Sequence, residues 1–277
     1  MIFFVDIDGT IRDYAEGIIP SAVKALELAG KSGHRLILCT GRTTGMIPKD
    51  VPLELFDGVI AGGGCYIALS GRILENSHIP DRTVAKYRSY FDNNCVPYSL
   101  ETVQGMFMNS PMSAIIRTLL LSGEDPETSD LKGLRSESIR CDRTLEEFDE
   151  MGLHASKLSF CLTREQYKSF SVPDEDALTL IHFTDSSDEY DHCELISRGC
   201  DKGDALTHMT RALGAKKSDT VMFGDSMNDA SAFAAAGTAV CMGNAPDDVK
   251  ALADMVTDHV TNDGFYKAIL TLLEKGQ

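Results

Sequence analysis

Short apolar runs alternate with an amphipathic stretch at the start of the chain. Ile2–Val5, Leu36–Cys39 and Gly58–Ala61 are the short, continuously apolar segments that are typical of buried strands. Ser21–Lys31, between the first two runs, carries apolar residues at helical spacing and is followed by Gly33 as a stop signal. This order of strand, helix and strand predicts a mostly parallel sheet.

The same alternation returns in the last third of the chain. Thr220–Phe223 and Ala239–Met242 are predicted strands, and helices are predicted at Asp204–Leu213, Ala230–Ala236, Pro246–Ala253 and Phe265–Glu274. The middle of the chain is different, because shorter strand candidates such as Lys157–Leu162 and Leu178–Phe183 alternate there with polar, acidic stretches. We therefore predict one discontinuous α/β core, residues 1–81 and 191–277, with an α+β cap inserted at residues 82–190.

Composition and charge narrow the possible partners of the 277-residue chain. Its 26 basic and 42 acidic residues give a net charge of −16, which would repel nucleic acid and anionic membranes. No apolar run approaches the roughly 18 to 20 residues that span a bilayer, and no basic segment precedes the apolar start, so we expect neither a membrane segment nor a signal peptide. The eight cysteines form no C-x-x-C pair, which favours reduced thiols, a cytoplasmic location and no zinc site.

Four polar motifs follow or precede the predicted core elements. They are Asp6-Ile7-Asp8-Gly9-Thr10, Thr40-Gly41-Arg42, Lys202-Gly203 and Gly224-Asp225-Ser226-Met227-Asn228-Asp229. Three of them come directly after a predicted strand, and ligands of open α/β sheets gather at the carboxyl ends of the strands. We therefore expect carboxylates, hydroxyls, an amide and an ammonium group to meet at one edge of the sheet.

These groups suit phosphoryl transfer. Mg²⁺ prefers oxygen ligands and usually keeps several waters, so two or three carboxylates suffice to hold it. A further carboxylate oxygen could attack phosphorus, while an ammonium and a hydroxyl group stabilise the phosphoryl oxygens. A second carboxyl group two residues from the nucleophile could protonate the leaving oxygen and later deprotonate water.

Each motif also has an ordinary structural interpretation. The Asp-x-Asp-Gly segment could be a turn, Thr40 could cap a helix, and Lys202 could be a solvated surface cation. Gly224-Asp225-Ser226 could be the nucleophile block of a serine esterase, but no histidine of the chain has Asp three positions before it, as such enzymes normally require. Only the four motifs together indicate chemistry, because each of them alone has an ordinary structural role.

In this order the four motifs resemble those of the haloacid dehalogenase superfamily, and they are most similar to its Cof-like branch of hydrolases. Met242-Gly243-Asn244-Ala245 and Asp263-Gly264 resemble the C-terminal signature of that branch. The resemblance covers both core segments, whereas in the middle third only the position and size of the cap match. It implies a Rossmann-like parallel-sheet core and an inserted α/β cap that selects the leaving group.

The resemblance also implies a role for each motif residue. Asp6 would be the nucleophile and a metal ligand, and Asp8 the general acid and base, which would reach the metal through its backbone carbonyl. Asp225 would complete the Mg²⁺ site, and Asp229 would contact the metal ligands without binding the metal itself. The phosphate-binding residues would be Thr40, Gly41, Lys202 and Asn228, of which Thr40 and Lys202 would also act in catalysis.

We therefore expect an Mg²⁺-dependent phosphatase that hydrolyses small phosphate monoesters, sugar phosphates first among them, through an aspartyl-phosphate on Asp6. A phosphomutase of the same superfamily and a non-catalytic phosphosugar-binding or regulatory protein are the alternatives. The expected partner is a small phosphorylated metabolite, and the sequence indicates no oligomeric state. Cap side chains that could contact a substrate, although each has common structural uses, are Tyr98, Met106, His154, Lys157 and His182.

Overall fold

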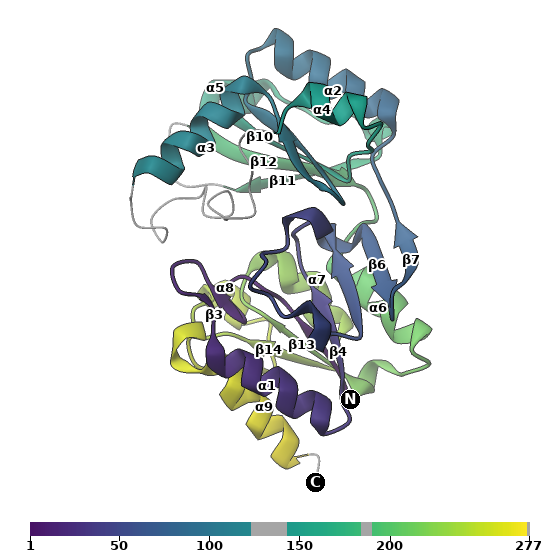
Figure 1. The fold of residues 1–277 in the computed structure, drawn as a ribbon, viewed down its shortest axis with the longest axis vertical. Coiled ribbons are helices and arrows are strands. Elements are labelled where there is room, and N and C mark those ends of the chain that lie inside the picture. Colours follow the sequence, from purple (N-terminus) through teal and green to yellow (C-terminus); the bar gives the residue numbers. More distant parts are fainter. Residues whose placement is uncertain (123–142, 184–189, 276–277) are drawn as a thin grey trace. The chain divides into compact units, whose positions relative to one another are not determined.

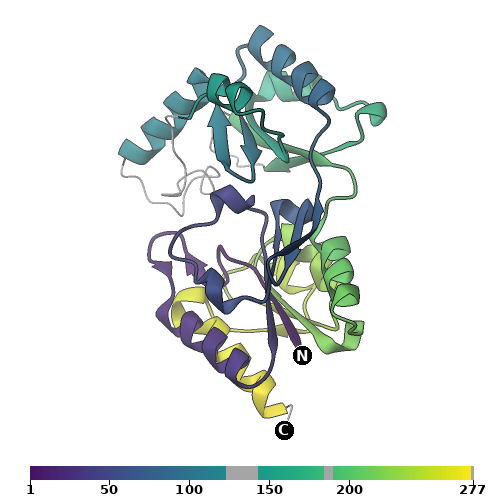
Figure 2. The same ribbon diagram turned by 45° about the vertical axis from the view of Figure 1, so that its right-hand side comes forward.

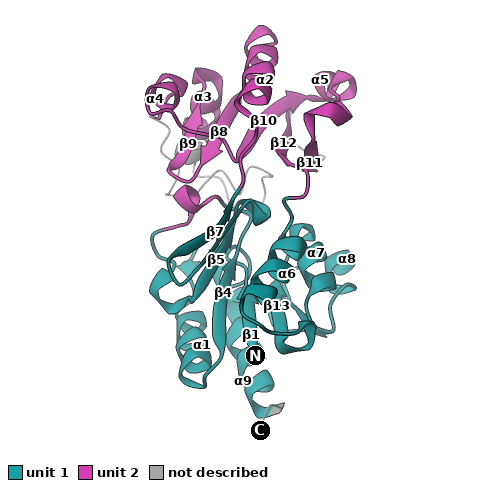
Figure 3. Cartoon of the chain, turned by 90° about the vertical axis from the view of Figure 1, so that its right-hand side faces the viewer, with its two compact units in different colours: residues 1–42, 49–76, 200–277 teal, residues 43–48, 77–199 magenta. Residues whose placement is uncertain are grey.

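The computed structural model describes residues 1–122, 143–183 and 190–275. The chain divides into two compact units, which Figure 3 colours separately. Unit 1 consists of residues 1–42, 49–76 and 200–277, and unit 2 of residues 43–48 and 77–199. Both bounds of the predicted cap, 82 and 190, therefore lie inside unit 2. None of the helices in the described ranges has the length and apolar character needed to cross a membrane.

Unit 1 is built on an eight-stranded sheet (Figure 1). Neighbouring strands from β15 to β5 pair in parallel, and β6 and β7 form an antiparallel hairpin at one edge. The mostly parallel α/β core that the sequence predicts is therefore confirmed. In spatial order the strands are β15 (Met255–Val256), β14 (Thr238–Cys241), β13 (Thr220–Gly224), β1 (Ile2–Val5), β4 (Arg35–Cys39), β5 (Gly58–Ala61), β6 (Tyr66–Leu69) and β7 (Arg72–Asn76).

Helices cover both faces of this sheet, because its central strands are apolar on both sides. In β1, Phe3 and Val5 join one apolar cluster, and Ile2 and Phe4 join a second cluster on the opposite face. The first cluster includes α1 (Pro20–Lys31) and α9 (Gly264–Lys275), which lie side by side in Figures 1 and 2. The second cluster includes α6 (Lys202–Ala212), α7 (Ala230–Ala235) and α8 (Asp247–Lys250). Burial on both faces explains why the strands are continuous apolar runs.

Two features of unit 1 differ from the sequence-based expectation. The helix predicted at Pro246–Ala253 is shorter, because α8 ends at Lys250 and the chain turns towards β15. The β6–β7 hairpin was not predicted, although Ser70-Gly71 is a turn dipeptide. Ser70 and Gly71 have φ of 49° and 78°, and positive φ at both central residues is the requirement of a type I′ hairpin turn.

Unit 2 contains a five-stranded antiparallel sheet. The strand order is β11 (Leu178–Phe183), β12 (Tyr190–Ser197), β10 (Lys157–Thr163), β8 (Tyr98–Thr102) and β9 (Gly105–Met108). Its helices are α2 (Asp81–Asn93), α3 (Ser110–Ser122), α4 (Leu145–Glu150) and α5 (Arg164–Ser169). The predicted strands at Lys157–Leu162 and Leu178–Phe183 are confirmed as β10 and β11.

Aromatic side chains form the core on one face of the unit 2 sheet. The ring centroid of Phe91 on α2 lies 4.7 Å from that of Phe160 on β10 and 5.2 Å from that of Tyr98 on β8. Tyr98 is fully buried, and its hydroxyl donates to Asp92. Tyr98 is therefore a core residue whose polar end is satisfied locally.

Gly237 shows how closely the backbone approaches itself in unit 1. A Cβ atom at this position would lie 2.3 Å from the carbonyl oxygen of Lys217 and 2.9 Å from the Cα of Ser218. We expect Gly237→Ala to lower the free energy of unfolding by about 1–3 kcal/mol, since backbone must shift to admit the methyl group. Urea denaturation measures this change.

The matched control is Gly30→Ala in α1, where the added Cβ would meet only a Leu36 methyl group at 4.0 Å. Because alanine is the better helix former, we expect Gly30→Ala to raise stability by about 0.5–1 kcal/mol. Equal effects of the two substitutions would contradict the steric explanation.

Candidate active site

The predicted motif residues meet at one edge of the unit 1 sheet. Asp6 follows β1, Thr40 follows β4, and Asp225 follows β13, so all three lie at the carboxyl ends of parallel strands. Lys202 is the first residue of α6, whose preceding residue Asp201 accepts hydrogen bonds from the amides of residues 203 and 204. The carboxyl ends of three strands and the start of α6 therefore each place one predicted site residue at this edge.

The Lys202 ammonium group connects the motifs. Its Nζ donates to Asp6 Oδ1 at 2.9 Å, Asn228 Oδ1 at 2.8 Å and Asp229 Oδ1 at 2.6 Å. Lys202 is 2% exposed and Asp229 is fully buried, so these are buried, charge-assisted contacts. Lys202 is therefore not a solvated surface cation, which was its alternative interpretation.

Three carboxylates converge beside Lys202. Asp6, Asp225 and Asp229 each offer an oxygen atom within 4.8 Å of those of the other two. Three negative charges and one positive charge, −3 + 1, leave the cluster with −2. Oxygen donors with this net charge suit one divalent hard cation such as Mg²⁺.

The pKa values of the cluster reflect its burial and crowding. Desolvation, opposed by Lys202 and reinforced by Asp229 and Asp8, raises the pKa of Asp6 to about 7. Burial, followed by repulsion from Asp229 and Asp6, raises the pKa of Asp225 well above its ordinary value. Burial works to lower the pKa of Lys202, but attraction to Asp229 and Asp6 outweighs it and raises that pKa. A bound cation would favour the ionised forms of Asp6 and Asp225 and so oppose these two shifts.

Asp8 lies beside two arginines rather than beside Lys202. Arg42 donates from Nε to Asp8 Oδ2 at 2.5 Å and from Nη2 to Asp8 Oδ1 at 3.0 Å, and Arg12 Nη1 lies 3.9 Å from Oδ1. This two-pronged contact fixes the orientation of the carboxyl group. Arg42 was not among the predicted site residues, although its place directly after Thr40-Gly41 was a signal for it.

Asn244 is a second residue that sequence reasoning did not assign. Its Nδ2 donates to the carbonyl of Gly9 at 2.9 Å and to Asp225 Oδ2 at 3.1 Å, and its Oδ1 accepts from the amide of Val260. Gly9 has φ of 73°, and a Cβ atom there would lie 1.9 Å from Asp225 Oδ2. Glycine is therefore required for Asp225 to lie so close to the Asp6–Asp8 turn. The position of Asn244 shortly after strand β14 was the available signal.

Thr40 and Gly41 form a buried turn opposite Asn228. Thr40 Oγ1 accepts from the amide of Arg42 at 3.1 Å, and a Cβ atom on Gly41 would lie 3.6 Å from Asn228 Nδ2. The amides of Gly62 and Gly63 donate to the carbonyls of Arg42 and Thr40, respectively, and so hold the turn from the next strand along the sheet. All eight predicted residues thus lie at this edge, Lys202 at the start of α6 and the other seven in the segments that follow the strands.

Comparison with known proteins decides the family. The model of the family described as haloacid dehalogenase-like hydrolase matches residues 3–269. The chain belongs to this family. The Cof-like resemblance inferred from the motifs is therefore confirmed, and it extends through the middle third, where the motifs gave no match.

Relatives of this hydrolase match it along almost its whole length. Phosphatase YwpJ of Bacillus subtilis is 29% identical and covers 94% of each chain, and pyridoxal phosphate phosphatase YbhA of Escherichia coli is 25% identical and covers 98% of each. Among solved structures, the subclass IIB sugar phosphatase BT4131 shares the fold over 98% of both chains, with a TM-score of 0.77 and 24% identity. The hydrolase is thus an enzyme of the phosphatase type within this family.

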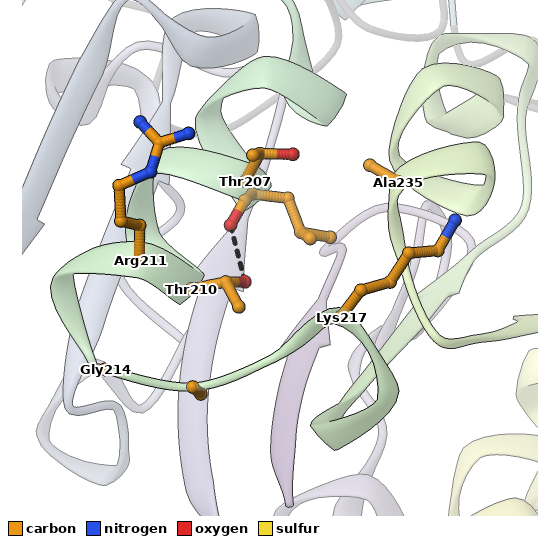
Figure 4. Close-up of a pocket in the computed structure, with 8 residues that line it drawn as sticks. Thr207, Thr210, Arg211, Gly214, Lys217 and Ala235 are labelled. Carbon is orange, nitrogen blue, oxygen red and sulfur yellow. Dashed lines mark hydrogen bonds between the residues drawn. The ribbon is translucent and has the colours of Figure 1, made fainter.

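A separate cavity of about 430 Å³ lies at the other end of α6 (Figure 4). Its lining includes Arg211 and Lys217, and Thr210, whose hydroxyl donates to the Leu206 carbonyl. Arg211 is nine residues beyond Lys202, which is roughly 13 Å along a helix rising 1.5 Å per residue. None of the residues lining this cavity belongs to the candidate active site.

Removing the Lys202 charge tests the electrostatic balance of the hydrolase. In EDTA at pH 8 we expect Lys202→Met to lower the free energy of unfolding by about 3–5 kcal/mol, because three buried carboxylates lose their cation. The deficit should shrink at pH 5.5, because without the ammonium group the folded-state pKa values of Asp6 and Asp225 lie still higher and these two carboxyls take up protons as the pH falls. Urea denaturation at both pH values measures it.

Lys24→Met, on an exposed position of α1, is the control and should change stability by no more than about 0.5 kcal/mol. A loss for Lys202→Met that is equal at the two pH values would show that the lysine stabilises the fold through packing alone.

Proposed function

We propose that this phosphatase hydrolyses small phosphate monoesters, sugar phosphates first among them, in a Mg²⁺-dependent reaction with an aspartyl-phosphate intermediate on Asp6. The observation that carries the proposal is the cluster of three carboxylates and one ammonium group, in which Asp6 and Asp229 are buried and Asp225 is half-buried, with its net charge of −2. We place the reaction in the cytoplasm, with a small phosphorylated metabolite as partner.

Asp6 is the nucleophile in this proposal. Its 5% exposed side chain lies at the end of β1, and Lys202 holds Oδ1 at 2.9 Å. The carboxylate forms a bond to phosphorus as the ester P–O bond breaks, and the leaving oxygen takes a proton from Asp8. A water molecule then returns a proton to Asp8 and attacks phosphorus, which releases Asp6 and inorganic phosphate.

Asp6, the backbone carbonyl of Asp8, and Asp225 would hold Mg²⁺, with Asp229 supporting them. When bound, the ion offsets charge on the phosphoryl oxygens and on the cluster. Lys202, the Thr40 hydroxyl, the Gly41 amide and Asn228 bind the remaining phosphoryl oxygens. Arg42 orients the Asp8 carboxyl group through both of its oxygens, and one of them must leave this contact before Asp8 can hold the proton that it donates.

The nucleophile is tested by Asp6→Asn, which keeps the shape of the side chain and removes its nucleophilicity. We expect phosphate release from an aryl phosphate and from sugar phosphates to fall at least about 10³-fold, while the thermal midpoint is not lowered. The midpoint should hold because the substitution also removes a charge from a crowded cluster. Asp247→Asn, on a fully exposed position of α8, is the control and should retain the wild-type rate. A folded Asp6→Asn protein with near wild-type turnover would refute the assignment.

The metal is tested by melting as well as by activity. EDTA should abolish turnover and Mg²⁺ restore it, and Mg²⁺ should raise the melting temperature of the wild type, since a ligand of the folded state alone stabilises it. Asp225→Asn should lose this Mg²⁺-dependent rise. In EDTA it should melt at the wild-type temperature or above, because it carries one buried negative charge fewer. Full activity in EDTA, or an unchanged response of Asp225→Asn to Mg²⁺, would overturn the site.

A further inference from the structure

Two thiols of unit 1 lie in contact beside the candidate active site. Cys65 follows the turn Gly62–Gly64, and Cys200 precedes Lys202 by two residues. The Cys65 thiol donates a hydrogen bond to the sulfur atom of Cys200, so the two sulfur atoms are neighbours although the residues are far apart in the sequence. Neither thiol takes part in the proposed chemistry.

The backbone next to the two thiols is also in close contact. A Cβ atom on Gly64 would lie 2.5 Å from the carbonyl oxygen of Asp201 and 3.0 Å from its amide nitrogen. Only glycine admits backbone as close as this. Cys65 and Cys200 are the chain neighbours of these two residues. The packing of unit 1 therefore holds the two thiols together, independently of how their side chains rotate.

Burial and hydrogen bonding give the two thiols different reactivity. Cys65 is 1% exposed and Cys200 is 8% exposed, so a small oxidant reaches Cys200 first. The hydrogen bond from Cys65 lowers the pKa of Cys200, against burial and repulsion from Glu75 and Asp201. A lower pKa means more thiolate, which is the form of cysteine that attacks a peroxide. We therefore expect Cys200 to react first and Cys65 to be its partner.

Cys200 differs in this respect from other buried thiols of the chain. Burial is the largest effect on four of them, and it raises their pKa values, which keeps the thiols protonated and unreactive. These four are Cys39, Cys161, Cys193 and Cys241.

We propose that Cys65 and Cys200 form a disulfide when a peroxide oxidises them, and that this disulfide reversibly lowers the turnover of the hydrolase. The Cys200 thiolate attacks one oxygen of hydrogen peroxide, the O–O bond breaks, and hydroxide leaves a sulfenic acid on Cys200. The Cys65 thiol then attacks the sulfenic sulfur, and the S–O bond breaks as water leaves. In total, two thiols lose two electrons and two protons, and one hydrogen peroxide becomes two waters.

The disulfide would act on the candidate active site through short stretches of backbone. Gly63, two residues before Cys65, donates from its amide to the Thr40 carbonyl at 3.1 Å, and Lys202 is two residues beyond Cys200. An S–S bond is only about 2.05 Å long, so the two segments must move together when hydrogen-bonded thiols become a disulfide. A displacement of about 1 Å can lower turnover about 10²-fold. This inference goes beyond the proposed function.

Peptide mapping of the full chain tests the disulfide without turnover. After treatment with hydrogen peroxide and digestion without reductant, we expect a peptide pair joined through Cys65 and Cys200, which dithiothreitol separates. In Cys65→Ser the second step is blocked, so dimedone, a reagent for sulfenic acids, should label Cys200. Absence of the joined pair from the oxidised wild type would overturn the inference.

Aryl phosphate release before and after peroxide treatment tests the effect on turnover. The kcat of the wild type should fall at least about tenfold and recover in dithiothreitol, whereas Cys200→Ser should keep its activity in peroxide. Cys95→Ser, the same change at an exposed cysteine, is the control and should respond as the wild type does.

A disulfide that leaves kcat unchanged, or an equal loss in the wild type and in Cys200→Ser, would contradict the proposed switch. Absence of phosphate release from every untreated protein would instead remove the proposed function, and peptide mapping would then decide on the thiol pair.

Discussion

The buried contact of one ammonium group with carboxylates organises the candidate active site of unit 1. Lys202 donates to Asp6 and to the adjacent residues Asn228 and Asp229, so its ammonium group joins three segments of the chain, its own included. Water reaches little of this contact, so a missing partner would leave a buried charge uncompensated. The β-strands bring these segments to one edge of the sheet. The glycines let the backbones approach closely enough for the charged groups to meet. The same balance leaves the site with a net charge of −2, which one divalent cation would neutralise.

Much of this arrangement could be predicted from the sequence, because it depends on strand ends. Asp6, Thr40 and Asp225 directly follow apolar runs, and parallel pairing brings the ends of such runs to one edge. Lys202 was harder to assign from the residues, since it precedes the predicted helix and does not directly follow a predicted strand. Only the order of the motifs distinguished it from a surface lysine. The family comparison confirms the resemblance that the motif order indicated, and the roles of the individual residues remain predictions.

Other features were not predictable, since they depend on tertiary contacts between residues far apart in the sequence. Arg42 is 34 residues from Asp8, and Asn244 is 235 residues from Gly9. No local pattern connects such pairs. In unit 2, the sequence shows that the side chains of β8, β10 and β12 alternate between the two faces of the sheet. It does not show which face packs against aromatic rings and which carries paired charges, because that depends on the helices that cover the sheet. Lys157, one of the five cap residues named as possible substrate contacts, lies on the face of the sheet opposite the aromatic core, whereas Tyr98 lies in that core.

The wide sequence separation within unit 1 has a consequence for the protein during its synthesis. Strand β1 is made first, yet its neighbour β13 is complete only at residue 224, so one edge of the central strand has no partner while the ribosome adds some 200 residues. At about 5–20 residues per second this lasts on the order of 10–40 s. An apolar strand with an open edge can pair with other chains. We therefore expect a chaperone to protect the nascent protein until its final third emerges.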